Sequence, residues 1–161
     1  MTEHFTFKEL YASDTADRYK INNEPKDPIV LKNLKFLAER LEDVRSILRH
    51  PIHINSAYRS LRVNQLVGSK PTSAHTKGLA ADIICPSFGS PRDVVLAITG
   101  SDIQYDQVIL EYDRWCHLGF AEEGKTPRLQ KLIIDSKGKL VKSSVGFMTS
   151  DQLISLANSI D

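Results

Sequence analysis

Three residues in the middle of the chain have the types and the spacing of a metal site. His75 lies in the segment SAHTKG, Asp82 follows within LAADII, and His117 lies within WCHLGF. Two histidines and an aspartate supply the nitrogen and carboxylate ligands of a tetrahedral zinc site that keeps a fourth position for water. An open position of this kind is typical of catalytic rather than structural zinc.

Spacing alone leaves a plainer interpretation open, in which His75 is a surface-loop histidine and Asp82 forms a turn or a salt bridge. The neighbouring residues favour the metal, because Asp82 and His117 each interrupt an otherwise apolar run. A buried aspartate or histidine needs a partner, and a shared cation would serve both. We therefore expect His75, Asp82 and His117 to bind one metal ion.

Around these residues the sequence resembles peptidase family M15, the zinc D-Ala-D-Ala carboxypeptidases, and in particular its small phage and prophage endolysin-like members. The pattern S-x-H-x-x-G-x-A-x-D runs from Ser73 to Asp82, and W-x-H runs from Trp115 to His117. The similarity covers about residues 5 to 120, and two motifs in the right order make it specific. It implies one zinc per chain, with His75, Asp82 and His117 as the ligands.

The resemblance also implies a substrate, the peptide stems of bacterial peptidoglycan, cut at D-Ala-D-Ala ends or at L-Ala-D-Glu bonds. In such enzymes the metal acidifies a water that attacks a carbonyl polarised by the same metal. Arg59, in the segment SAYRS, resembles the family arginine that orients the substrate, and a guanidinium suits a carboxylate. Ser73 either contacts the substrate or bonds only its own loop.

The general base is where the sequence departs from the simplest family pattern. Many members carry a carboxylate three residues before the last histidine ligand, but Arg114 occupies that position and cannot accept a proton. The two candidates are Glu111, at the end of an expected strand, and Asp113, in the turn that follows. We favour Glu111, because a buried strand holds a carboxylate more rigidly. A structural role for Glu111, as the partner of Arg59 or Arg114, remains open.

The helices and strands that must position these residues can be predicted from the sequence. They indicate a single α+β domain over residues 1–161. Apolar residues recur at helical spacing over residues 28–48, and capping boxes at Thr6 and Thr149 begin a short first helix and a closing one. Shorter helices are expected after Ser60 and Ser90. Alternating or apolar runs predict strands at 52–55, 79–85, 107–112 and 115–120, and a hairpin around 136–138. We expect a small, mostly antiparallel sheet packed with N-terminal helices and the C-terminal helix, as in DD-peptidases and hedgehog signalling domains.

Composition excludes several other classes of protein. Twenty-one basic and twenty acidic residues leave a charge of +1, which gives no electrostatic reason to expect a nucleic-acid or membrane partner. Cys85 and Cys116 lack the spacing of a redox or zinc pair and are expected to be buried free thiols. The start MTEHFTFKEL has no signal-peptide features. Together with the resemblance to the M15 family, this implies synthesis in the cytoplasm and action on the cell wall after release, or as part of a virion. We also expect a monomer.

A second function class stays open beside the peptidase. The same fold can retain zinc and serve as a non-catalytic module that binds the cell wall or builds a virion. The arginine in place of a carboxylate before His117 is the feature that keeps this alternative in view.

Overall fold

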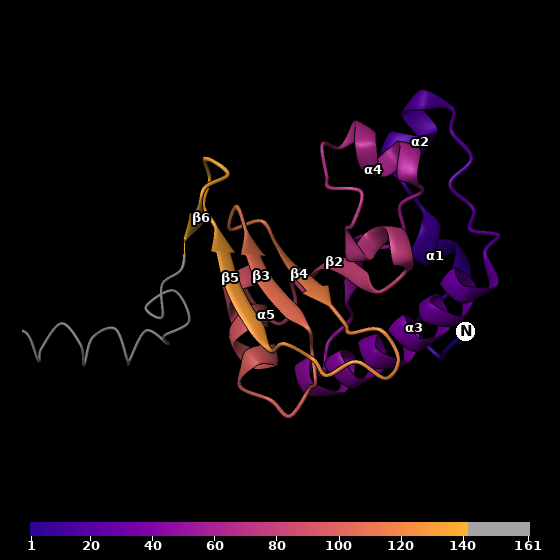
Figure 1. The fold of residues 1–161 in the computed structure, drawn as a ribbon. Coiled ribbons are helices and arrows are strands. Elements are labelled where there is room, and N and C mark those ends of the chain that lie inside the picture. The colour runs from indigo at the N-terminus through magenta and orange to yellow at the C-terminus, as the bar shows by residue number, and fades with distance from the viewer. Residues whose placement is uncertain (142–161) are drawn as a thin grey trace, which may run out of the picture.

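A six-stranded sheet, in the order β1-β2-β4-β3-β5-β6, forms the centre of this computed structural model, which describes residues 1–141 (Figure 1). Neighbouring strands are antiparallel except for β3 and β5, which are parallel. The predicted α+β domain with a mostly antiparallel sheet is thus confirmed. In chain order the strands are β1 (His53–Ser56), β2 (Ala80–Ile84), β3 (Gln107–Glu111), β4 (Trp115–Gly119), β5 (Gln130–Ile134) and β6 (Leu140–Val141).

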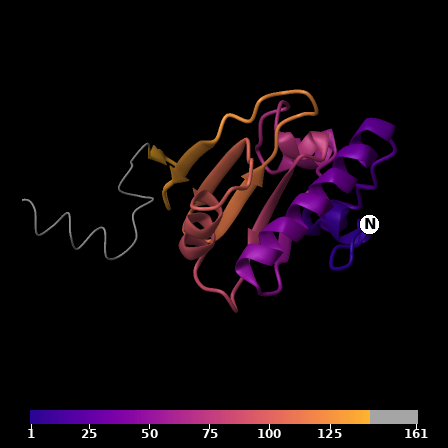
Figure 2. The same ribbon diagram turned by 90° about the horizontal axis from the view of Figure 1, so that it is seen from below.

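Two helices, α3 (Pro28–Leu48) and α5 (Pro91–Thr99), pack against one face of this sheet (Figure 2). Alternation along the strands directs one set of side chains to these helices, among them Ile83, Leu110 and Leu118, all of which are buried. The other set, which includes Asp82 and His117, points to the opposite face. The sheet therefore separates the hydrophobic core from the polar site.

The longest helix, α3, follows from local rules that the sequence displays. The Asp27 side chain accepts a hydrogen bond from the amide of Ile29, and Pro28 takes the first helical position, where its missing N–H costs nothing. The buried stripe at helical spacing consists of Leu34, Leu37, Leu41, Val44 and Leu48. Each such side chain contributes about 1.5–3 kcal/mol on burial, so α3 is a rigid support for the sheet.

The remaining helices are short and lie near the N-terminus or beside the site. They are α1 (Phe7–Tyr11), α2 (Asp14–Tyr19), α4 (Leu61–Leu66) and the 3-10 helix η1 (Ala74–Lys77). The capping box of Thr6 and Glu9 is present, and Ser60 caps α4 as expected. Helices α2 and η1 are not among those expected from the sequence.

Several other expectations from the sequence can be compared with the structure. Cys85 and Cys116 are both free and buried, as predicted. No helix within residues 1–141 is long and apolar enough to cross a membrane. The closing helix expected after Thr149 lies outside the described residues.

Candidate metal centre

Two of the three predicted metal ligands lie side by side on neighbouring strands. Asp82 of β2 and His117 of β4 are directly paired in the antiparallel register. Paired residues of this kind project their side chains to the same face at a separation of about 5 Å. Both residues are buried. The pairing of β2 with β4 therefore sets the relative positions of two candidate ligands without any contribution from a loop.

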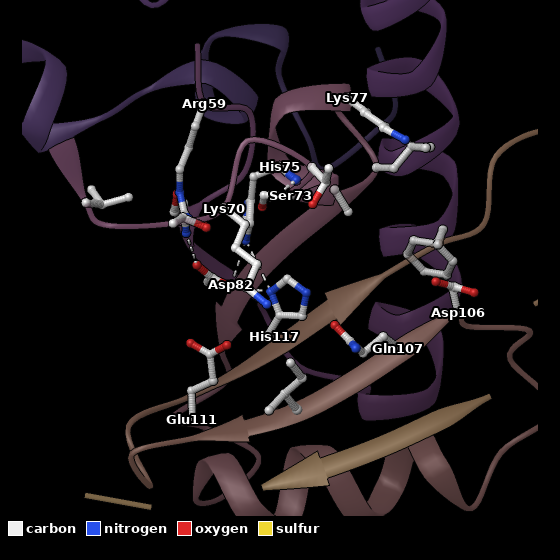
Figure 3. A pocket seen from close by; sticks show the side chains of 18 of the residues that line it. Arg59, Lys70, Ser73, His75, Lys77, Asp82, Asp106, Gln107, Glu111 and His117 are labelled. Atoms are coloured by element: carbon white, nitrogen blue, oxygen red, sulfur yellow. Dashed lines mark hydrogen bonds and ion pairs between the residues drawn. The ribbon is translucent and has the colours of Figure 1, made fainter. Parts of the chain in front are cut away.

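The third ligand, His75, comes from η1, which folds back over β2 (Figure 3). The turn between them requires glycine at position 78, which has a positive φ of 71° and caps η1 in the left-handed region. A Cβ at Gly78 would also lie 3.0 Å from Cγ of Leu34 and 3.2 Å from the carbonyl of Val30. Gly78 thus serves both the turn and the close approach of η1 to α3.

The three side chains present their ligand atoms at the corners of a small triangle. Nδ1 of His117 lies 2.9 Å from Oδ1 of Asp82, and Nε2 of His75 lies 3.1 Å from Nδ1 of His117. Nε2 of His75 lies 3.2 Å from the same Oδ1 of Asp82. Neighbouring ligand atoms around a tetrahedral zinc ion are about 3.3 Å apart, given Zn–ligand distances of about 2.0–2.1 Å. The triangle has the dimensions of one face of such a site.

The protonation states of the His75 and Asp82 side chains also suit the binding of a cation. Nδ1 of His75 lies 2.6 Å from the carbonyl of Ala57 and donates to it, which leaves the lone pair of Nε2 facing the site. Burial lowers the pKa of His75 and so favours the neutral, ligating form. Burial alone would raise the pKa of Asp82, but the two neighbouring histidines hold it well below its ordinary value. Two imidazoles and one carboxylate that converge in this way suit zinc.

Arg59 lies beside this cluster, with its side chain only 14% exposed. Its Nη2 donates to Oδ2 of Asp82 at 2.5 Å, and its Nε donates to Oγ of Ser56 at 2.9 Å. Asp82 therefore directs one oxygen to the histidines and the other to the guanidinium. A surface arginine that only caps a loop would not be mostly buried and paired with a buried carboxylate, as Arg59 is.

Glu111 and Asp113, the two candidate bases, have different surroundings. Glu111 lines the cleft at the end of β3, and its Oε2 accepts a hydrogen bond from Nε1 of Trp115 at 2.9 Å. Burial and the charge of Asp82 raise the pKa of the Glu111 carboxyl. Asp113 is exposed and lies in the turn with a positive φ of 54°.

The β3–β4 turn is one residue longer than the sequence suggested. The strand ends at Glu111, and Tyr112 joins Asp113 in the left-handed region at the centre of the turn. The amide of Arg114 closes the turn on the carbonyl of Glu111 at 2.9 Å. Tyr112 was expected in the strand, and its place in the turn brings Glu111 directly opposite Trp115.

The cluster forms the floor of a cleft of about 1240 Å³ that extends to both sides of it (Figure 3). Arg59 and Ser73 line one part of the cleft, and Gln107 and Asp106 line another. Its volume exceeds the roughly 300–1,000 Å³ of typical small-molecule sites, so the cleft suits an extended substrate. Oγ of Ser73 accepts from the amide of His75 at 3.4 Å, which shows that this side chain also bonds its own loop.

Sequence reasoning missed two contacts that shape the site. The carbonyl of Ala57 orients His75, but any residue type offers a carbonyl, so no sequence signal marked it. Trp115 was identified only as the first residue of the W-x-H motif, whereas its indole N–H is also the hydrogen-bond partner of Glu111. The W-x-H motif contained the signal, since a buried Trp N–H usually finds an acceptor.

Comparison with known proteins gives one result that bears on this site. No curated protein matches the chain. A family model described as Peptidase M15 matches residues 3–119, a range that includes His75, Asp82 and His117 as well as Arg59 and Glu111. Because this match spans well over half of the sequence, we conclude that the chain belongs to the peptidase M15 family.

Proposed function

We propose that the protein is a zinc-dependent peptidase that hydrolyses the peptide stems of bacterial peptidoglycan, at D-Ala-D-Ala ends or at L-Ala-D-Glu bonds. The observation that carries the proposal is the buried triangle of His75, Asp82 and His117 on the floor of a large cleft, in a chain of the M15 family. Zinc held there would polarise a peptide carbonyl and lower the pKa of water. We expect the protein to act as a monomer with one zinc per chain.

Glu111 is the proposed general base. Its Oε2 is held by Trp115, which leaves Oε1 to take a proton from the attacking water and return it to the leaving amine. The raised pKa of this carboxyl brings it closer to the operating range of a group that must both accept and release a proton. This carboxylate in the cleft favours an enzyme over a non-catalytic module of the same fold.

Arg59 is the proposed substrate-binding group, with Ser73 on the same side of the cleft. The guanidinium has five N–H donors, and the contacts with Ser56 and Asp82 use Nε and one hydrogen of Nη2. The remaining donors are suited to a carboxylate at a peptide C-terminus or on a D-Glu side chain. A peptide stem carries such carboxylates.

Incubation with purified peptidoglycan, followed by mass spectrometry of the soluble products, tests the proposal. We expect release of free alanine from D-Ala-D-Ala ends or of fragments cut at L-Ala-D-Glu bonds. A chelator should abolish the products and added zinc should restore them. If zinc-loaded protein cleaves neither bond yet sediments with the insoluble peptidoglycan, the peptidase proposal is wrong and the binding module takes its place.

A further inference from the structure

The irregular segment formed by residues 57–60, between β1 and α4, contacts two of the three candidate ligands. The carbonyl of Ala57 accepts from Nδ1 of His75, and the amide of Arg59 donates to the carbonyl of His75 at 3.2 Å. The side chain of Arg59 bonds Asp82. Because this segment has no regular secondary structure, other contacts must fix its conformation.

Asn23 supplies two of those contacts, one on each side of Arg59. Its Oδ1 accepts from the amide of Ser60 at 2.8 Å, and its Nδ2 donates to the carbonyl of Tyr58 at 3.1 Å. Nδ2 also donates to the carbonyl of Tyr11 at 2.7 Å, which ties the segment to the end of α1. The residue is only 6% exposed, so water is a poor substitute for these partners.

We propose that Asn23 is a positioning residue that acts through Arg59, by holding the backbone on both sides of it so that the guanidinium meets Asp82. The inference rests on the proposed metal site for its effect on zinc. Loss of the Asn23 carboxamide would remove one restraint on each side of Arg59: the Tyr58–Arg59 peptide would keep the bond from its amide to the His75 carbonyl but lose the one at its carbonyl, and the Ser60 amide would lose its acceptor. The Arg59 side chain would then lose its fixed direction, and Asp82 would lose a hydrogen bond that orients its carboxylate.

Asn23→Leu tests this positioning role, because it removes the three hydrogen bonds and keeps a side chain of similar size. Asn64→Leu is the matched control. Asn64 is also buried, and its Nδ2 donates to the carbonyls of Ser69 and Lys70, away from residues 57–60. Asn23→Ala is the second variant, to be used if the leucine variant does not fold.

The first measurement is the ¹H–¹⁵N signal of the Arg59 Nε–H, assigned by its disappearance in Arg59→Lys. A bonded Nε–H gives a dispersed, slowly exchanging signal, and we expect the Asn23 variants to lose it and Asn64→Leu to retain it. The second is the zinc dissociation constant from competition with a chelator. We expect a rise of about 10-fold or more in the Asn23 variants, the usual cost of removing an outer partner of a ligand, and little change in Asn64→Leu.

A double-mutant cycle with Arg59→Gln separates positioning from a merely structural role. If Asn23 acts through Arg59, Asn23→Leu should cost less than about threefold in zinc affinity once Arg59 is already replaced. Equal losses in both backgrounds, or an unchanged Arg59 signal and zinc affinity in both Asn23 variants, would overturn the inference. If wild-type protein binds no zinc, the proposed function fails instead, and the Arg59 signal still decides the role of Asn23.

Discussion

Arg59 and Asp82 form an ion pair that divides the two oxygens of the aspartate between two partners. Oδ2 accepts from Nη2 of Arg59 at 2.5 Å, while Oδ1 lies 2.9 Å from Nδ1 of His117 and 3.2 Å from Nε2 of His75. A carboxylate engaged in this way can offer a metal only one oxygen. The arginine therefore bears on the candidate ligand set as well as on the substrate contact proposed for it.

Arg59→Ala should lower kcat/KM on a stem-peptide substrate by about 10-fold or more, because a hydrogen bond to a charged group is worth about 1.5–3 kcal/mol. It should also weaken zinc binding, since the Asp82 carboxylate loses its partner on Oδ2. Steady-state kinetics and chelator competition measure the two effects. Arg62→Ala, on the exposed side of α4, is the control and should change neither. An unaltered kcat/KM in zinc-loaded Arg59→Ala would remove Arg59 from the substrate site.

Removal of zinc should lower the thermal stability of the protein, because three electron-rich atoms lie within 3.2 Å of one another without it. At free zinc 100 times the dissociation constant, binding stabilises the folded state by about 2.7 kcal/mol. We expect a chelator to lower the Tm by several degrees and added zinc to restore it. His117→Ala should abolish this response, while His53→Ala, an exposed histidine on β1, should retain it. Equal melting temperatures with and without zinc in the wild type would count against the site.

Local rules explain the parts of the fold that the sequence predicted well. The bounds of α3 follow from Asp27, Pro28 and a stripe of leucines, each of which acts over only a few residues. Two of the three candidate ligands were found for a related reason, and the third, His75, from the motif that ends at Asp82. Asp82 and His117 interrupt apolar strands, and a buried polar residue in such a strand demands a partner.

The features that escaped prediction depend on contacts between distant residues. No motif in the sequence marks Asn23, because its partners Tyr58 and Ser60 lie far along the chain. The parallel pairing of β3 with β5 is likewise set by tertiary packing, since each strand alone fits either direction. Hydrogen bonds between side chains and distant backbone leave no periodic signal.

Arg128→Met should destabilise the protein at neutral pH and have little effect in acid. Its guanidinium bonds both carboxylate oxygens of Asp106 at the edge of the cleft and lowers the pKa of that carboxyl. A lowered pKa stabilises the fold above the unfolded value of about 3.9, and this contribution is lost as the pH falls through the folded value. For this partly exposed pair we expect a loss of about 0.5–1 kcal/mol at pH 7.

Urea unfolding at pH 7 and at about pH 3 measures this difference, because the contribution of the pair shrinks once the pH is below the unfolded pKa of an aspartate, about 3.9. Lys131→Met, an exposed basic residue on β5, controls for the loss of one positive charge. If Arg128→Met lowers the free energy of unfolding equally at both pH values, the pair with Asp106 does not contribute in the way described.

Glu111→Gln should keep the fold and the zinc but lose about 100-fold or more in kcat, the usual contribution of a positioned general base. The Glu111 carboxylate lies in the cleft and is held by Trp115, and glutamine retains an oxygen for that indole N–H while losing the ability to take a proton. Asp113→Asn is the matched control, because Asp113 lies in the exposed turn only two residues away. Turnover of one stem-peptide substrate, with zinc content measured for each variant, gives the comparison. If Asp113→Asn loses activity and Glu111→Gln does not, the assignment is wrong, and if both remain active the base is another group.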